Sequence, residues 1–174
     1  MTENAHLSLV LGGARSGKSA YAERLIAAHP TPWTYIATAQ IYDEEMRARV
    51  SAHIARRGDG WRTIEAPRAL PQAIGNAPAA APLLVDCLTL WLSNRLLGEA
   101  DLAADRAALI AALAARCAPT VVVSSEVGLS IVPDNALARA FRDAAGEAHQ
   151  AVAGIAARVA LVVAGLPLSV KEPR

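Results

Sequence analysis

The sequence predicts a single α/β domain in which a mostly parallel β-sheet is flanked by helices. Short apolar segments alternate along the chain with longer segments whose apolar residues recur at helical spacing. This alternation is typical of strands and helices that follow one another in a parallel sheet covered on both faces. The chain has 174 residues, of which 53% are hydrophobic, and this suffices for one sizeable core. We therefore expect one domain over residues 1–174.

The first half of the chain alternates strands and helices. Apolar or alternating runs predict the strands, and apolar residues at helical spacing predict the helices between them. In chain order the predicted elements are strand Leu7–Leu11, helix Lys18–Ala28, strand Trp33–Ala37, helix Asp43–Arg57 and a short extended segment, Trp61–Ile64.

The second half continues the alternation and ends on a strand. In order it contains strand Leu83–Cys87, helix Leu88–Leu97, helix Leu102–Arg116, strand Thr120–Ser124, helix Asn135–Ala157 and strand Val159–Ala164. Helix Leu88–Leu97 is apolar almost all round, which indicates either full burial or a subunit interface. The two cysteines, Cys87 and Cys117, lack metal-ligand spacing and are expected to be buried thiols.

The glycine-rich segment after the first strand gives the clearest functional pattern. It reads Gly12-Gly13-Ala14-Arg15-Ser16-Gly17-Lys18-Ser19 and fits G-x-x-x-x-G-K-[ST], the phosphate loop of nucleotide-binding proteins. Its glycines let successive backbone N–H groups face one anion, Lys18 adds a positive charge, and the Ser19 hydroxyl can ligate Mg²⁺. We therefore predict that a nucleoside triphosphate binds with Mg²⁺ to a fold of the P-loop NTPase (RecA-like) type.

Asp86 follows the apolar run Leu83-Leu84-Val85, at the carboxyl end of a predicted strand, where ligands collect in parallel sheets. In phosphate-loop proteins such an acid often holds Mg²⁺ through water. The same carboxylate could instead accept hydrogen bonds from a base, or cap helix Leu88–Leu97. The residue types leave these three roles open.

Three further segments are expected at the same edge of the sheet. They are the turn Thr38–Tyr42, the loop Ser125–Pro133 and the tail after Gly165. The loop Ser125–Pro133 is too apolar for a plain solvent loop and carries one acid, so we expect it to face the substrate or to act as a lid.

Helix Asp43–Arg57 places a histidine between two arginines. Arg49, His53 and Arg56 recur at helical spacing beside an apolar stripe, so they share one face. Neighbouring cations favour the neutral, nucleophilic imidazole, and the arginines could hold phosphate oxygens. His53 is thus a candidate nucleophile for a phosphoramidate intermediate, the alternative being an ordinary solvated histidine.

Glu65 follows the short extended segment Trp61–Ile64 and is a candidate for base recognition. A carboxylate accepts two donors at once, and guanine offers such a pair at N1 and N2 whereas adenine does not. Glu65 or Asp86 near the base would therefore favour GTP. The alternative for Glu65 is an ordinary exposed side chain.

Composition and charge favour a small molecule as the binding partner over nucleic acid or a membrane. The net charge is +1 and basic residues are scattered among acidic ones, which gives no footprint for nucleic acid or a membrane surface. Residues Met1–His6 lack the cationic flank of a signal peptide, and the longest apolar run, Val159–Leu168, is too short to span a membrane. We expect a cytoplasmic protein with no nucleic-acid partner and no membrane insertion.

Motifs along most of the chain together resemble one family. They read GGARSGKS, YIATAQIYDEEMRARVSAHIARR, WRTIEAP, LLVDCLTLWLSN, SSEVGLSIVP, FRDAAGEAHQ and VVAGLPL. From about Leu7 to Lys171 the chain resembles the bifunctional adenosylcobinamide kinase / adenosylcobinamide-phosphate guanylyltransferases of cobalamin biosynthesis. These motifs are specific, because they combine the phosphate loop with the Tyr-Ile-Ala-Thr turn and the Asp-Glu-Glu-Met helix.

The resemblance implies a corrinoid substrate and two reactions. ATP or GTP phosphorylates the hydroxyl of adenosylcobinamide, and GMP then passes from GTP to that phosphate through a guanylylated histidine. His53 matches this histidine, and Lys18 matches the catalytic lysine of the phosphate loop. The other implied site residues are the phosphate cradle Gly12–Ser19, the nucleotide contacts Ala37, Thr38, Ala39, Ile54, Ala55, Arg56 and Arg57, and the base-recognising or metal-linked acids Glu65 and Asp86, with Ser19 also on Mg²⁺. The family also implies a homo-oligomer, a trimer.

Three positions differ from the family pattern. Ser125 replaces the asparagine that usually precedes Glu-Val-Gly, Ser130 replaces a glycine, and His149 replaces an asparagine before Gln150. None of these removes a predicted catalytic group. The residues alone leave two other functions open: a phosphate-loop kinase of another small alcohol, and a non-catalytic nucleotide switch.

Overall fold

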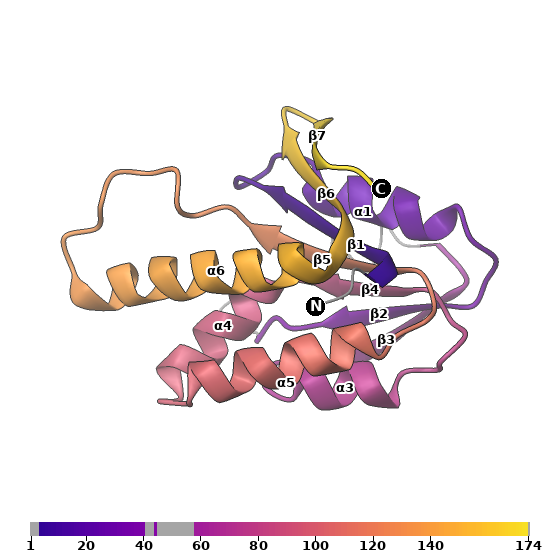
Figure 1. The fold of residues 1–174 in the computed structure, drawn as a ribbon, viewed down its shortest axis with the longest axis horizontal. Coiled ribbons are helices and arrows are strands. Elements are labelled where there is room, and N and C mark those ends of the chain that lie inside the picture. The colour runs from indigo at the N-terminus through magenta and orange to yellow at the C-terminus, as the bar shows by residue number, and fades with distance from the viewer. Residues whose placement is uncertain (1–3, 41–43, 45–57, 174) are drawn as a thin grey trace.

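The fold is taken from a computed structural model, which describes residues 4–40, 44 and 58–173. These residues form a seven-stranded sheet with strand order β3-β2-β4-β5-β1-β6-β7 (Figure 1). The strands are β1 Asn4–Gly12, β2 Trp33–Ala37, β3 Trp61–Glu65, β4 Leu83–Asp86, β5 Thr120–Ser125, β6 Ala156–Val163 and β7 Leu166–Lys171. The helices are α1 Lys18–Ala27, α3 Leu70–Asn76, α4 Leu88–Leu97, α5 Leu102–Ala114 and α6 Ala136–Ile155.

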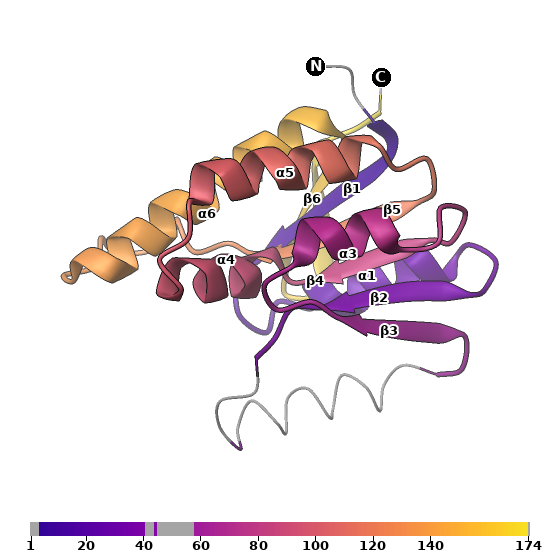
Figure 2. The ribbon, with the colours of Figure 1, turned by 90° about the horizontal axis from the view of Figure 1, so that it is seen from below.

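Helices cover both faces of the sheet and create two cores. Helix α1 packs on one face with Val10 and Leu84, while α3 to α6 pack on the other with Leu9 and Val85 (Figures 1 and 2). Neighbouring residues of a strand point to opposite faces, so the apolar run in β1 serves both cores. The predicted α/β fold, with its sheet flanked by helices, is confirmed.

All strands from β1 to β6 run parallel to their neighbours, and β7 alone pairs antiparallel, with β6. Strand β5 lies between β1, which leads into the phosphate loop, and β4, which ends in Asp86. The carboxyl ends of six strands therefore meet at one edge of the sheet, and the predicted site residues of the described chain lie there.

Two elements were not predicted from the sequence. Helix α3 has only seven residues, with Pro71 in its first turn and Gly75 near its end, so it shows too few turns for a periodic pattern. Strand β7 is exposed and contains Pro167, which a strand tolerates mainly at a sheet edge. Both elements depend on tertiary packing more than on local pattern.

Other predictions hold with small corrections. Several helices and strands begin or end one to three residues away from the predicted position. Asn135, for example, was expected to begin a helix but is the N-cap of α6, and its side chain accepts a hydrogen bond from the Ala138 N–H. Cys87 is buried as expected, but Cys117 is exposed, because it follows the end of α5.

The predicted helix Asp43–Arg57 lies outside the described residues. No helix in the described part of the chain is long and apolar enough to cross a membrane.

Helix α4 is buried within the chain itself. Leu88 and Trp91 are 0% exposed, and the Trp91 indole N–H donates to the Arg68 carbonyl at 2.9 Å. Leu97, in the last turn, is 60% exposed. Of the two interpretations of this apolar helix, burial in the core accounts for most of its length, and Trp91 does not face a subunit interface.

Truncating Trp91 should therefore destabilise the folded chain. Trp91→Ala leaves a cavity in the core and an Arg68 carbonyl without its donor, which should cost about 3–5 kcal/mol of unfolding free energy. Leu97→Ala, on the same helix but exposed, should change the unfolding free energy by less than about 1 kcal/mol. Urea unfolding followed by circular dichroism measures both, and equal losses for the two variants would show that α4 packs differently.

Candidate functional site

The strand register brings the predicted acids to the carboxyl edge of the sheet. Ala37, the last residue of β2, pairs with Glu65 of β3 on one side and with Asp86 of β4 on the other. Two strand spacings, about 10 Å, therefore separate the backbones of Glu65 and Asp86. Two strands further along, Gly12 at the end of β1 pairs with Ser125 of β5. The edge thus presents acids at one end and the phosphate loop at the other.

The phosphate loop ends at an uncapped helix. Gly17 is the N-cap of α1 and adopts a left-handed conformation with φ 92°, and no side chain caps this helix. The first turn of α1 also carries no acidic residue. The free N–H groups and the positive end of the helix dipole therefore face the loop, an arrangement that binds phosphate.

Neighbouring segments hold the loop on both sides. The Glu126 N–H donates to the Gly12 carbonyl at 3.0 Å, and the Gly165 N–H donates to the Ser16 carbonyl at 2.8 Å. A Cβ on Gly12 would lie 2.7 Å from the Val162 carbonyl oxygen and would also meet the Ser16 hydroxyl. Gly12 therefore has to be glycine because the backbone of β6 lies directly against it.

The loop carries one cationic side chain and one buried hydroxyl without a partner. The Lys18 ammonium donates to the Gly13 carbonyl at 3.1 Å, so the side chain folds back over the loop. The Ser16 hydroxyl is buried, and it is the only buried polar side-chain atom in the described residues that lacks a hydrogen-bond partner. A phosphate in the loop could take Lys18 as a new partner without changing the fold of α1.

Asp86 is half-buried and faces the site without capping a helix. The Tyr35 hydroxyl donates to its Oδ2 at 3.2 Å. Helix α4 begins after Cys87, which is its N-cap, and no side chain caps it. The capping role considered for Asp86 is thus wrong, and metal binding and base recognition remain.

Ser19 and Asp86, the predicted metal ligands, carry the kind of oxygen donor that Mg²⁺ prefers. Both offer oxygen, and Mg²⁺ is commonly held by one or two carboxylates together with substrate phosphates and waters. Among the residues the structure describes, no cluster of three or more His, Cys, Asp or Glu could hold a metal alone. A metal at this edge would therefore need the phosphates of a nucleotide.

Cys87, the neighbour of Asp86, is a structural thiol. Burial, and to a smaller extent the negative charge of Asp86, raises its pKa to about 11, although hydrogen bonds and the positive charge of Lys18 partly oppose this shift. A thiol with such a pKa is not a nucleophile at neutral pH.

The turn after β2 is fixed by a buried hydrogen-bond network. The Thr38 hydroxyl donates to the Cys87 carbonyl at 2.7 Å and accepts from the Cys87 N–H at 2.8 Å. The Asn94 side-chain amide donates to the Thr38 carbonyl and to the Pro67 carbonyl, both at 2.9 Å. Asn94 thereby joins the segments that follow β2 and β3. Asn94 was not among the residues predicted from the sequence, although an amide on the buried face of an apolar helix is a recognisable pattern.

Glu65 lies at the end of β3 and is exposed. The next residue, Ala66, donates its N–H to the Ala37 carbonyl at 2.8 Å, so the ends of β2 and β3 stay together. Of the predicted contacts, Ala37 lies between the two acids in the strand register, and Thr38 and Ala39 follow it. His53 and the predicted contacts Ile54, Ala55, Arg56 and Arg57 fall outside the described residues.

The loop Ser125–Pro133 begins beside the phosphate loop and presents apolar side chains to solvent. Leu129 is 84% exposed and Ile131 is 94% exposed. At the base of the loop, His149 of α6 is buried, and its Nε2 lies 2.7 Å from the Ser124 hydroxyl. Burial lowers the pKa of His149, and the neighbouring Glu126 opposes this shift. His149 is therefore a buried neutral imidazole at neutral pH.

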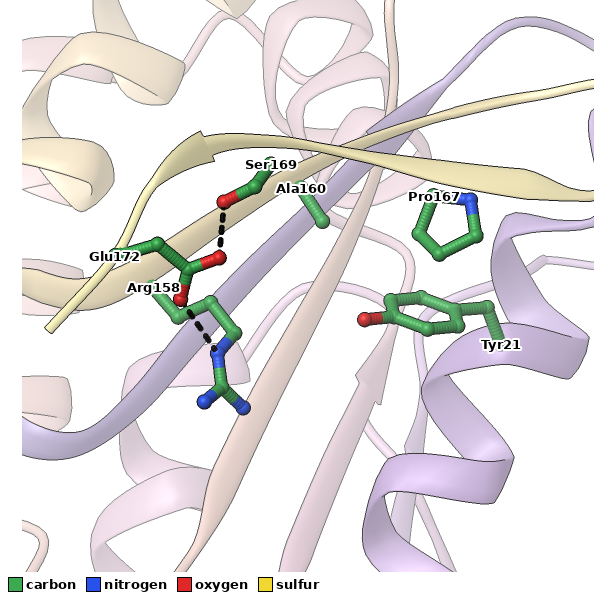
Figure 3. A pocket seen from close by; sticks show the side chains of 6 residues that line it. All are labelled: Tyr21, Arg158, Ala160, Pro167, Ser169 and Glu172. Carbon is green, nitrogen blue, oxygen red and sulfur yellow. Dashed lines mark hydrogen bonds and ion pairs between the residues drawn. The ribbon is translucent and has the colours of Figure 1, made fainter.

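A cavity of about 270 Å³ lies away from this edge, between α1 and the β6–β7 hairpin (Figure 3). Its polar side chains pair with one another: Arg158 Nε lies 3.7 Å from a Glu172 carboxylate oxygen, and the Ser169 hydroxyl bonds the same carboxylate. Pro167, Ser169 and Glu172 belong to the tail after Gly165, which forms β7 and runs back along β6 instead of staying at the carboxyl edge as expected. The cavity contains none of the residues predicted to bind the nucleotide. The carboxyl edge of the sheet is therefore the candidate site.

Comparison with known proteins gives consistent matches over nearly the whole chain. A family model described as cobinamide kinase / cobinamide phosphate guanyltransferase matches residues 8–170. A Pseudomonas aeruginosa protein, named bifunctional adenosylcobalamin biosynthesis protein CobP, is 48% identical over 169 residues, which cover 95% of this chain and 98% of the relative. A Salmonella typhimurium protein, named bifunctional adenosylcobalamin biosynthesis protein CobU, is 44% identical over 180 residues, covering 94% and 98%. These relatives thus match nearly the whole of this chain.

The contacts of Gly12 give a test of the loop geometry. Gly12→Ala forces a methyl group against the Val162 carbonyl and should cost about 1–3 kcal/mol of unfolding free energy without any nucleotide present. Gly13→Ala is the matched control, because a Cβ there meets nothing within 4 Å. Urea unfolding of the two variants compares them directly, and a Gly12→Ala protein as stable as Gly13→Ala would refute the close approach of β6.

Proposed function

The chain belongs to the cobinamide kinase / cobinamide phosphate guanyltransferase family, and we propose that it catalyses both reactions on adenosylcobinamide. In the first, ATP or GTP phosphorylates the substrate hydroxyl. In the second, GMP passes from GTP to adenosylcobinamide phosphate, which gives adenosylcobinamide-GDP and pyrophosphate. The observation that carries the proposal is the phosphate loop at the carboxyl edge, within a family match that spans residues 8–170.

The kinase reaction requires positioning and charge neutralisation more than covalent chemistry. The N-terminus of α1 and Lys18 hold the β- and γ-phosphates. The substrate hydroxyl oxygen bonds to the γ-phosphorus, the bond to the bridging β–γ oxygen breaks, and the hydroxyl proton is released. Mg²⁺ held by Ser19 and Asp86 would neutralise charge on the phosphates.

The guanylyl transfer needs a nucleophile, and His53 is the residue we assign to it. A neutral imidazole nitrogen attacks the α-phosphorus of GTP and pyrophosphate leaves. A phosphate oxygen of the acceptor then displaces the histidine, which regains its free nitrogen. Arg49, Arg56 or Arg57 would stabilise the charge that develops on the α-phosphate. The support for His53 is its sequence context and the family match.

Substitution of His53 tests the covalent step. With GTP labelled at the α-phosphate, His53→Ala should retain no label after denaturation, while the wild type should retain a label that is stable to base and labile to acid. Kinase activity should stay measurable in His53→Ala, because the first reaction does not use the histidine.

The controls separate this nucleophile from other groups. His29→Ala removes an exposed histidine elsewhere and should label normally. Lys18→Ala should lose both half-reactions through weak nucleotide binding. Label that persists in His53→Ala, or that maps to Lys18, would overturn the assignment. A wild type that never acquires label but phosphorylates a small alcohol would be a simple kinase.

Base recognition is tested at the two acids. A carboxylate from Glu65 or Asp86 should pair with guanine N1–H and N2–H, while adenine presents an acceptor at N1. Glu65→Gln or Asp86→Asn should therefore lower the preference for GTP over ATP in nucleotidyl transfer by roughly tenfold to a hundredfold. The ratio of kcat/KM for the two donors measures this. If neither variant changes the ratio, backbone groups read the base.

A further inference from the structure

Glu126 lies where the phosphate loop and the exposed loop Ser125–Pro133 meet. Its backbone N–H donates to the carbonyl of Gly12, the first residue of the phosphate loop, at 3.0 Å. Its carboxylate Oε1 accepts from the Gly128 N–H at 2.6 Å, within the exposed loop. One residue thus bonds to the nucleotide-binding segment through its backbone and to the outer loop through its side chain.

His149 lies beside the other oxygen of this carboxylate. Its Nδ1 lies 3.6 Å from Glu126 Oε2, and the side chains are 9% and 21% exposed. An ionised carboxylate only accepts hydrogen bonds, so Nδ1 of the neutral ring carries the proton. Nε2 then accepts from the Ser124 hydroxyl, 2.7 Å away. The ring is therefore oriented by β5 on one side and directs its N–H toward Glu126 on the other.

The hydrogen bond from Gly128 and the contact with His149 hold the carboxylate at the point where the outer loop leaves the site. Beyond Gly128 the chain turns outward, and its apolar residues Leu129 and Ile131 are almost fully exposed. The acceptor in the proposed reactions must reach phosphates held beside Gly12, next to the base of this loop. A change in the direction of the loop would therefore affect the acceptor before the nucleotide.

We infer that Glu126 and His149 are positioning residues that hold the loop Val127–Pro133 for the acceptor and leave nucleotide binding to the phosphate loop. The inference rests on the proposed function. It assigns to Glu126 and His149 a role in acceptor affinity that differs from the nucleotide contacts described above. Neither residue is assigned a chemical step.

Steady-state kinetics on the full chain test the inference. Glu126→Ala removes the carboxylate but keeps the N–H bond to Gly12, and should raise the KM for adenosylcobinamide at least about tenfold. The KM for GTP and the rate of guanylyl-enzyme formation without acceptor should stay within about twofold of wild type. His149→Leu should act in the same direction, and its effect should not add to that of Glu126→Ala, because both act through one loop.

Matched variants separate positioning from general damage. His149→Asn keeps an N–H donor near the place of Nδ1, and should restore most of the acceptor affinity that His149→Leu loses. Glu147→Ala also removes a glutamate side chain, on α6, where it is exposed and paired with Arg106, and should behave as wild type. Should His149→Leu fail to fold, Glu126→Ala carries the test, because its side chain is partly exposed.

The outcomes are distinguishable from failure of the proposed function. A wild type that does not phosphorylate adenosylcobinamide would refute the function itself. An active wild type with an unchanged acceptor KM in Glu126→Ala would refute the inference alone. Equal increases in the KM for acceptor and for GTP would also refute it, since the pair would then support the phosphate loop.

Discussion

The site depends on one constraint, the parallel pairing of β1 with β5 on one side and β6 on the other. Leu9 and Val10, in the middle of β1, are completely buried and serve opposite cores, so the strand cannot shift without exposing apolar surface. That register carries Gly12 to the edge, where Glu126 and Gly165 supply the N–H groups that hold the loop. Hydrogen bonds from within the chain therefore support the phosphate loop on both sides.

The same edge separates charge in a way that suits a nucleotide. Lys18 and the N-terminus of α1 lie at the end of β1. Asp86 lies at the end of β4, which β5 separates from β1, and Glu65 lies at the end of β3, which β2 separates from β4. A triphosphate favours the first region, and a guanine base or a metal ion favours the second. Buried hydrogen bonds of Thr38 with Cys87 and of Asn94 with Thr38 hold together the segments that follow β2 and β4. Because Asn94 belongs to α4, this apolar helix also stabilises the site.

Much of this arrangement could be predicted from the sequence, because the features concerned depend on patterns among neighbouring residues. The phosphate loop has a fixed spacing, and strands such as Trp33–Ala37 are short apolar runs with the expected bounds. Helix α3 and strand β7 lack such patterns and form because the rest of the fold covers or pairs them. Hydrogen bonds between distant residues, such as Ser124 with His149, have no periodicity in the sequence. The difference between Cys117 and Cys87 likewise depends on where α5 ends.

The central claim is that the carboxyl edge of the sheet binds the nucleotide, with phosphates at the α1 N-terminus and the base toward Glu65 and Asp86. A crystal structure of the protein with Mg²⁺ and a non-hydrolysable GTP analogue tests it most directly. We expect β- and γ-phosphate oxygens within hydrogen-bond distance of the N–H groups of the phosphate loop and of Lys18. An analogue bound in the cavity lined by Tyr21 and Arg158, with the phosphate loop untouched, would contradict it.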